Sequence, residues 1–146
     1  MKIDAKTEAA VMRAFENLWK AYEKRDSASL LSLVAPDPDV LVYGTGADEK
    51  RIGRKEVEVQ FKRDWSQSEA ASLRFQRHTV SSSGPVAWVA ADGAAHVKVA
   101  GGEVEMPLRV TTIFEQRGDK WLVVHMHVST PASEQAEGES WAPPPR

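Results

Sequence analysis

The sequence has no cysteine, and neither sign of charge dominates it. Its 146 residues include 19 lysines and arginines against 21 aspartates and glutamates, a formal net charge of −2. The absence of cysteine excludes disulfides, thiolate catalysis and zinc sites built on cysteine, and it is typical of cytoplasmic proteins. Without a basic excess or a stripe of lysine and arginine, the chain offers no electrostatic footprint for a phosphate backbone. We therefore expect no nucleic-acid partner.

Long apolar runs are missing as well. No segment approaches the ~18 apolar residues that a membrane span requires. The first residues, MKIDAKTEAAV, place Asp4 and Glu8 where a signal peptide has its apolar core. The sequence thus predicts a cytoplasmic protein with no membrane partner, and its length suits one domain with one core.

The N-terminal half contains helical periodicity. Over residues 4–25 apolar side chains recur at intervals of three and four, which predicts an amphipathic helix. Asp26 can cap a second, short helix that ends before Pro36. A third helix is predicted through Val57, Phe61 and Trp65, which share one helical face because they lie four residues apart.

The C-terminal half contains strand patterns. A short strand is expected at residues 40–43, and four β-rich runs follow Ser66, separated by Ser-Gly-Pro, Gly-Gly and Gly-Asp turn signals. Three helices followed by an antiparallel meander predict an α+β domain, a cone whose curved sheet carries the helices on its concave face. We assign this domain to residues 1–131. The tail, residues 132–146, ends in three prolines and is expected to be extended or disordered. The four β-rich runs that follow Ser66 are residues 73–82, 86–99, 104–116 and 121–129.

The order of elements and the segment RVTTIFEQRGDKWLVVHMHVSTP carry a family resemblance. The chain resembles the nuclear transport factor 2-like superfamily, and this segment is similar to the terminal hairpin of its SnoaL-like members. The kinase association domain of calcium/calmodulin-dependent protein kinase II is similar there too, with a tryptophan, two histidines one residue apart and a serine. The resemblance covers residues 4–131 and implies the cone fold. It selects no single activity, because this fold hosts isomerases, polyketide cyclases, dehydratases, transport factors and assembly hubs.

The resemblance to the association domain extends to only part of that domain's pocket. Trp65 corresponds to the tryptophan that lines the pocket of that domain. Its two pocket arginines correspond to Thr112 and Val128, and its helical histidine corresponds to Val57. These replacements argue against a small-carboxylate site of the same type in this chain.

The register of the final hairpin decides which side chains share a face. A two-residue Gly-Asp loop pairs Thr112 with His125, whereas a three-residue Arg-Gly-Asp loop puts Arg109 opposite His127. We favour the three-residue loop because it separates polar from apolar side chains across the strands. It predicts a polar face of Arg109, Thr111, Glu115, His125, His127 and Ser129, and an apolar face of Leu108, Val110, Thr112, Phe114, Leu122, Val124, Met126 and Val128.

The apolar face would then point toward the helices and the cavity, and the polar face would be convex. In this superfamily the convex face is a common dimer surface. The resemblance therefore implies a homodimer through the sheet, with Arg109, His125 and His127 hydrogen-bonded in the interface. A cavity position for at least one of these three side chains is the first alternative, and simple solvent exposure is the second.

Two groups are candidates for acid–base chemistry. His127 and Asp92 are the predicted catalytic residues, and strand alternation would have to aim Asp92 inward, although the adjacent Gly93 equally indicates a bulge or turn. The predicted ligand-binding residues would line the pocket with aromatic rings and with polar groups that can hydrogen-bond to a ligand. No metal is expected, since a histidine pair without a third ligand at a predictable spacing is a weak signal, and no cofactor is implied. The predicted ligand-binding residues are Tyr43, Phe61, Trp65, Arg109 and His125.

Together these patterns predict a small-molecule-binding protein with an apolar cavity. Its chemistry would be that of an isomerase, cyclase or dehydratase, using acid–base catalysis on a hydrophobic carbonyl compound. The alternative is a noncatalytic association module, in which the fold serves oligomerisation and the pocket is vestigial.

Overall fold

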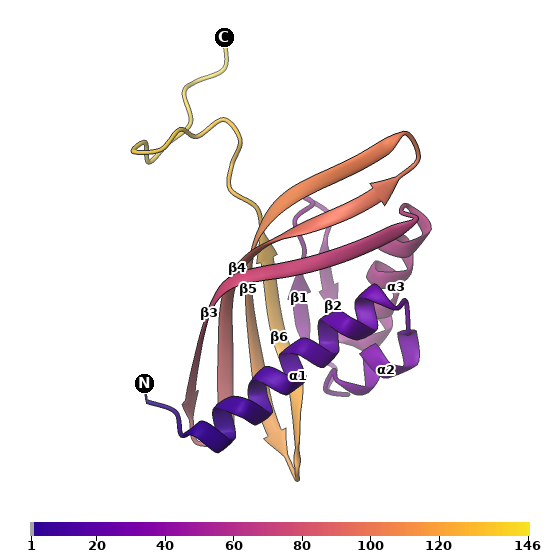
Figure 1. Cartoon of the computed structure of the whole chain (residues 1–146), viewed down its shortest axis with the longest axis vertical. Helices are drawn as coiled ribbons and strands as arrows, with labels where there is room; N and C mark the ends of the chain where they lie inside the picture. Colours follow the sequence, from indigo (N-terminus) through magenta and orange to yellow (C-terminus); the bar gives the residue numbers. More distant parts are fainter. Residues whose placement is uncertain (1) are drawn as a thin grey trace.

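The computed structural model describes residues 2–146 and contains the predicted elements in the predicted order (Figure 1). Asp4 caps the first helix by accepting a hydrogen bond from Thr7 N, and Asp26 caps the second by accepting from Ser29 N. The helices are α1 (Ala5–Glu23), α2 (Ser27–Ser32) and α3 (Gly53–Ser66), and the strands are β1 (Leu41–Tyr43), β2 (Lys50–Ile52), β3 (Ala70–Ser83), β4 (Val86–Val99), β5 (Gly102–Arg117) and β6 (Lys120–Ser129).

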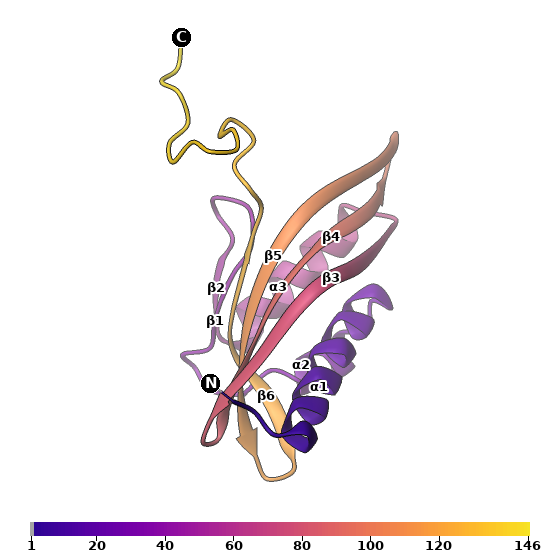
Figure 2. The ribbon, with the colours of Figure 1, turned by 60° about the vertical axis from the view of Figure 1, so that its left-hand side comes forward.

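The helices and the sheet form two layers. Figure 2 shows all three helices on the same side of a strongly curved sheet, with α1 running across its inner face. The buried apolar residues of both layers make one continuous cluster that includes Phe15, Leu18, Val89 and Phe114. This arrangement confirms the predicted α+β cone with helices on the concave face.

The sheet is mixed rather than purely antiparallel. Its strand order is β2-β1-β6-β5-β4-β3, and β1 pairs in parallel with β6, with Val42 opposite Met126. The short β2 lies in a polar segment that sequence patterning treats as a loop. A strand of three mostly exposed residues has no alternation long enough to be detected.

The loop of the final hairpin is one residue shorter than predicted. Arg117 pairs with Lys120, so the loop has two residues instead of three. A bulge between Ile113 and Phe114 then adds one residue to β6, and Thr111 pairs with His127. These two changes together move the register by an even number of residues, which leaves the faces beyond the bulge unchanged.

The predicted separation of polar and apolar faces is therefore confirmed beyond the bulge. Val110, Thr112 and Met126 are buried against the helices. Arg109 and His127 share the outer face, as predicted. Before the bulge the prediction is wrong: Leu122 pairs with Glu115 on the outer face, while the inner face of β6 is formed there by the buried Trp121 and Val123.

Thr112 is a polar side chain in the apolar core. It is fully buried opposite Val89, and its hydroxyl has no hydrogen-bond partner within residues 2–146. A buried hydroxyl without a partner has lost its hydration without compensation.

Replacing this hydroxyl should stabilise the protein. We expect Thr112→Val to raise the free energy of unfolding by about 1 to 2 kcal/mol, since the substitution removes the unpaired group and keeps the branched shape. Urea denaturation followed by circular dichroism measures the change. Thr111→Val, on the exposed outer face of the same strand, is the control and should change stability by less than about 0.5 kcal/mol. A destabilised Thr112→Val variant would contradict the prediction.

The chain after β6 leaves the body of the cone. Residues 130–146 contain no helix or strand, and Trp141 is 85% exposed. Both views show this segment extending away from the sheet (Figures 1 and 2). None of the helices within residues 2–146 is both long enough and apolar enough to cross a membrane.

Candidate functional site

A cavity of about 330 Å³ lies between the helices and the inner face of the sheet. Its apolar wall comes mainly from alternating residues of four long strands, which point inward because the inner face is the buried one. Trp19 and Phe61 cover it from the helical side. The sheet residues of this wall are Ala71, Leu73, Ala95, Val97, Met106, Leu108, Met126 and Val128.

The opposite wall of the cavity is polar. Tyr22, in the last turn of α1, donates a 2.8 Å hydrogen bond to Oδ2 of Asp64 in α3. Both residues line the cavity. The contact pairs a phenol with a partly buried carboxylate beside an apolar surface, an arrangement able to hold and move a proton.

Gln60 connects this pair to the rest of the polar wall. Its Nε2 donates to Oδ1 of Asp64 and to Oε1 of Glu49, both at 2.8 Å, and its Oε1 accepts from Nε of Arg51 at 3.0 Å. The amide orientation is fixed, because only the nitrogen can donate to carboxylates and only the oxygen can accept from a guanidinium. One buried amide thus sets the spacing of two carboxylates and one guanidinium.

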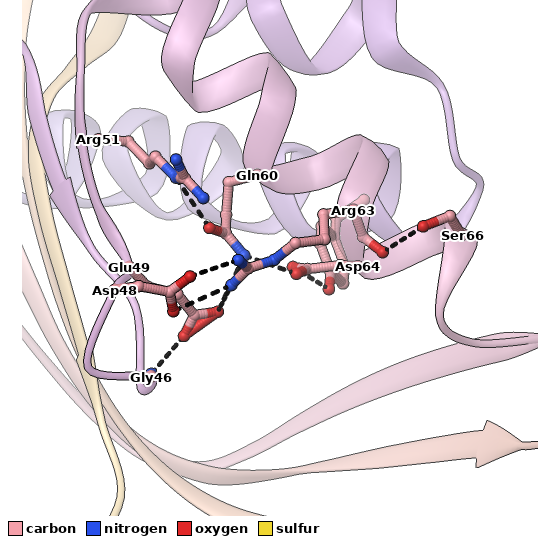
Figure 3. A network of polar contacts seen from close by, with 9 residues as sticks. Gly46, Asp48, Glu49, Arg51, Gln60, Arg63, Asp64 and Ser66 are labelled. Carbon is pink, nitrogen blue, oxygen red and sulfur yellow. Dashed lines mark hydrogen bonds and ion pairs between the residues drawn. The ribbon is translucent and has the colours of Figure 1, made fainter.

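Figure 3 shows how α3 and the segment between β1 and β2 assemble this wall. Glu49 belongs to that segment, and its second carboxylate oxygen accepts from the backbone of Gly46. Arg63 of α3 approaches Glu49 to 3.4 Å and Asp48 to 2.7 Å from outside the cavity. These contacts tie the segment to α3.

The Tyr22 and Asp64 backbones are held in place by reciprocal contacts between α1 and α3. Trp65 Nε1 donates to Tyr22 O at 3.0 Å, and Ser68 Oγ donates to Asp64 O at 2.8 Å. Arg25 adopts a left-handed backbone conformation and donates to Trp65 O at 2.6 Å and to Ser68 O at 2.8 Å. The phenol and the carboxylate are therefore positioned by two helix ends that are bonded to each other.

Burial raises the pKa of both the Asp64 carboxyl group and the Tyr22 phenol. Loss of hydration raises the pKa of Asp64 above its ordinary value, while the hydrogen bonds from Tyr22 and Gln60 oppose this shift. Burial, followed by the charge of Asp64, also raises the pKa of the Tyr22 phenol well above its ordinary value. Asp64 is therefore a stronger base than an exposed carboxylate, and Tyr22 stays protonated at neutral pH.

The raised pKa of Tyr22 can be measured directly. The chain has two tyrosines, so in Tyr43→Phe the phenolate absorbance reports Tyr22 alone. We expect its midpoint above pH ~10, the value of a free tyrosine. Adding Asp64→Asn should lower the midpoint, because the neighbouring negative charge is removed. A midpoint at the free value in the folded Tyr43→Phe protein would contradict the assignment.

The structure brings only some of the predicted site residues to the cavity. Phe61 and Tyr43 line it. Trp65 stacks on Phe61 with ring centroids 6.2 Å apart and supports the wall from behind. The ring of Tyr43 also lies 5.1 Å from that of His127, at the edge where β1 pairs with β6.

The other predicted residues lie on the outer face of the sheet. His125 and His127 alternate with the buried Met126. Asp92 pairs with Arg109 on one side and with Arg77 on the other, and all three are exposed. Of the two possibilities that the sequence left open for Asp92, the inward position is therefore wrong, because the neighbouring Ala91 occupies it, and a bulge is present opposite Gly93 in the pairing of β3 with β4. Across residues 2–146 no group of three or more candidate ligands is arranged to hold a metal ion.

Sequence reasoning missed Asp64, Gln60 and Glu49. A signal was present for the first two, since Gln60 and Asp64 are four residues apart and adjoin the apolar stripe of Val57 and Phe61. Polar groups beside a buried stripe are candidates for a site. Glu49 gave no such signal, because it lies in a polar segment whose position depends on the tertiary structure.

Comparisons with known proteins agree with this fold. A protein provisionally named a dehydratase of the NTF2-like family, from Streptomyces avermitilis, has a TM-score of 0.78 at 19% identity, covering 89% of this chain and all of that one. An NTF2-like superfamily protein from Salmonella enterica has a TM-score of 0.78 at 16% identity, covering 93% and 96%. A protein from Xanthomonas campestris, provisionally named a calcium/calmodulin-dependent protein kinase II association domain, has a TM-score of 0.74 at 22% identity, covering 90% and 91%.

At these identities the similarity shows a shared fold and carries no information about activity. No curated protein matches the sequence. The family model described as a SnoaL-like domain matches residues 11–133, which include all the residues that line the cavity. The chain therefore belongs to the SnoaL-like domain family, and it has the fold of NTF2-like proteins.

Proposed function

We propose that the protein is an acid–base enzyme that enolises a small hydrophobic carbonyl compound, as an isomerase, cyclase or dehydratase does. The observation that carries this proposal is the Tyr22–Asp64–Gln60–Arg51 chain of hydrogen bonds along one wall of an otherwise apolar cavity. A volume of about 330 Å³ is near the lower end of the ~300–1,000 Å³ of ligand pockets, which suits a compound of one or two rings.

Asp64 is the proposed base. Its raised pKa matches a group that removes a proton from the carbon next to a carbonyl. Tyr22 and Gln60 each donate to one oxygen of this carboxylate, and each oxygen keeps a second lone pair that can accept a proton. The electrons released from the C–H bond move to the carbonyl oxygen, which becomes an enolate.

Arg51 is the proposed partner of that enolate oxygen. Its Nε is bound by Gln60, and within residues 2–146 the structure gives its two terminal nitrogens no other partner. A fixed guanidinium beside the forming oxyanion stabilises the transition state more than the neutral ground state. In a dehydratase the same enolate would expel a hydroxyl group two carbons away, and protonated Asp64 would return its proton to the leaving oxygen as water forms. A structural neighbour provisionally named a dehydratase agrees with this class.

Enolisation can be tested without knowing the natural substrate. We expect the protein to accelerate exchange of the α-protons of 2-tetralone in D2O, followed by proton NMR. Asp64→Asn should reduce this acceleration by about 10²-fold or more, the usual contribution of a general base. Asp92→Asn is the matched control, because Asp92 is the acidic residue that the sequence predicted to be catalytic and it lies on the outer face. This variant should exchange the protons as fast as wild type does. Equal loss in both variants, or none in Asp64→Asn, would reject the proposal.

The same substitution should stabilise the fold. Because the folded-state pKa of Asp64 is raised, its contribution to stability is full below the unfolded value of 3.8 and is lost as pH rises through the folded value. In Asp64→Asn there is no carboxyl group to ionise, so this decrease in stability does not occur. The asparagine amide can still accept a hydrogen bond from Gln60 and donate one to the Tyr22 oxygen. We expect a higher urea midpoint than wild type at pH 7 and a smaller difference at pH 3.

The outer face of the sheet favours a second role, assembly with another copy of the chain. Arg77, Asp92 and Arg109 form a row of alternating charge across β3, β4 and β5. Another row on the same face is largely apolar and consists of Trp88, Ile113, His125, Leu41 and Ile52. A self-complementary face of this kind suits a homodimer. Light scattering should give a dimer for wild type and a monomer for Trp88→Glu, and a monomeric wild type would reject this role.

A further inference from the structure

The charges around the cavity bear on which ligands it can accept. Two carboxylates, Glu49 and Asp64, line the polar wall, and Arg51 is the cationic side chain that lines it. The Glu49 side chain is only 15% exposed. Both carboxylates accept from the same nitrogen of Gln60 at 2.8 Å, so they are close neighbours held in fixed positions.

The cations near this wall do not offset both carboxylates. Arg51 donates through Nε to Gln60, and it supplies one positive charge to the cavity lining against two negative ones. Arg63 neutralises part of the charge on Glu49 and Asp48, but it does so from outside the cavity. An anionic ligand entering the cavity would thus lose its hydration next to a local excess of negative charge, which is costly at short range in a poorly solvated site.

From this geometry we propose that the cavity selects uncharged ligands and that Glu49 is the residue that excludes carboxylates. The inference rests on the proposed function, since it describes the same site, and it names the ligand class: neutral, mainly apolar compounds that carry a carbonyl or hydroxyl group. Arg51 can still stabilise an oxyanion that forms during the reaction, because that charge is generated inside the site and need not be brought in from water.

Glu49 is suited to this task because its own contacts fix it. Its two oxygens accept from Gln60 and from the backbone of Gly46, and the methylene groups of its side chain pack close to Gly44 and Gly46. The carboxylate therefore cannot swing away to admit an anion without breaking contacts on both sides. Glu49→Gln keeps the shape and size of the side chain while removing its charge.

A matched pair of probes tests the proposal by isothermal titration calorimetry. Methyl 4-acetylbenzoate is uncharged, and 4-acetylbenzoate has the same ring and ketone with a carboxylate. We expect wild type to bind the ester at least about tenfold more tightly than the acid. Glu49→Gln should bind the acid about tenfold more tightly than wild type does, with little change for the ester. Glu49→Asp, which keeps the charge, should still exclude the acid.

Glu103→Gln, the same substitution at an exposed position of β5 outside the cavity lining, is the control and should bind both probes as wild type does. Circular dichroism verifies that each variant is folded. The proposal is overturned if wild type binds both probes equally, if it binds neither, or if Glu49→Gln still excludes the acid. These outcomes differ from failure of the proposed enolisation, which is judged by proton exchange in Asp64→Asn and does not depend on the charge preference.

Discussion

Phe114→Ala is expected to lower the free energy of unfolding by about 3 to 5 kcal/mol, the usual cost of removing a large aromatic side chain from a packed core. Phe114 is fully buried on the inner face of β5, in the same apolar cluster as residues of α1. The rigid strands on either side cannot collapse into the space left behind, so both the lost burial and the cavity contribute.

Urea denaturation monitored by circular dichroism measures this loss. Ile113→Ala is the matched control, because Ile113 is the preceding residue and lies half-buried on the outer face. It should cost about 1 kcal/mol, in proportion to the smaller apolar area that it buries. Similar losses in the two variants would show that the inner and outer faces have been assigned wrongly at the bulge.

Gly93→Ala is expected to destabilise the fold by about 3 kcal/mol, the upper range for forcing extra atoms into a packed region. A Cβ at this position would lie 2.1 Å from the carbonyl oxygen of Arg74 and 2.9 Å from Cα of Phe75. The pairing of β3 with β4 shifts between Phe75 and Arg77, directly opposite. Gly93 therefore permits a close approach of two backbones at the β3 bulge, where the strand bends.

The same substitution at another glycine separates this clash from other effects. Gly84 has a φ of +57°, and nothing lies within 4 Å of a Cβ built there. Gly84→Ala should thus cost about 1 kcal/mol, from left-handed backbone strain alone. If Gly93→Ala loses no more stability than Gly84→Ala, the close approach at the bulge is not a requirement of the fold.

Local patterns predicted the elements well. The intervals of Phe15, Trp19 and Tyr22 predicted α1, and the apolar spacing of Val57 and Phe61 predicted α3, because each helix buries one stripe. The β-rich runs after Ser66 coincide with β3 to β6 to within a few residues. These patterns are visible in the sequence because burial against a core repeats with the period of the element itself.

The register of the final hairpin and the partner of each strand in the sheet were harder to predict from the sequence. Loop length and bulge position in the last hairpin are each one-residue effects, and together they kept His127 on the predicted face while moving Leu122 to the other one. The parallel pairing of β1 with β6 joins segments that are far apart in the sequence. Such a pairing depends on how the helices direct the chain and leaves no local pattern.

The candidate site was hardest to predict because its members come from separate elements. Tyr22 of α1, Asp64 of α3 and Arg51 of β2 meet only when the two helix ends cross the inner face of the sheet. His125 and His127 were the clearer signal in the sequence, because they are separated by one residue and alternate with apolar residues. Their alternation correctly predicted a shared face on the convex side of the sheet, but it gave no sign that the polar groups of the cavity would come from α1, α3 and β2.

By itself the sequence determined the class of fold, the order of its elements and, beyond the bulge, the separation of the last hairpin into a polar and an apolar face, because each of these follows from the repeated burial of nearby residues. The tertiary structure alone decided which polar groups face the cavity. A carboxylate becomes a candidate base when distant elements remove its water and supply its hydrogen bonds, and neither effect can be read from the residues beside it.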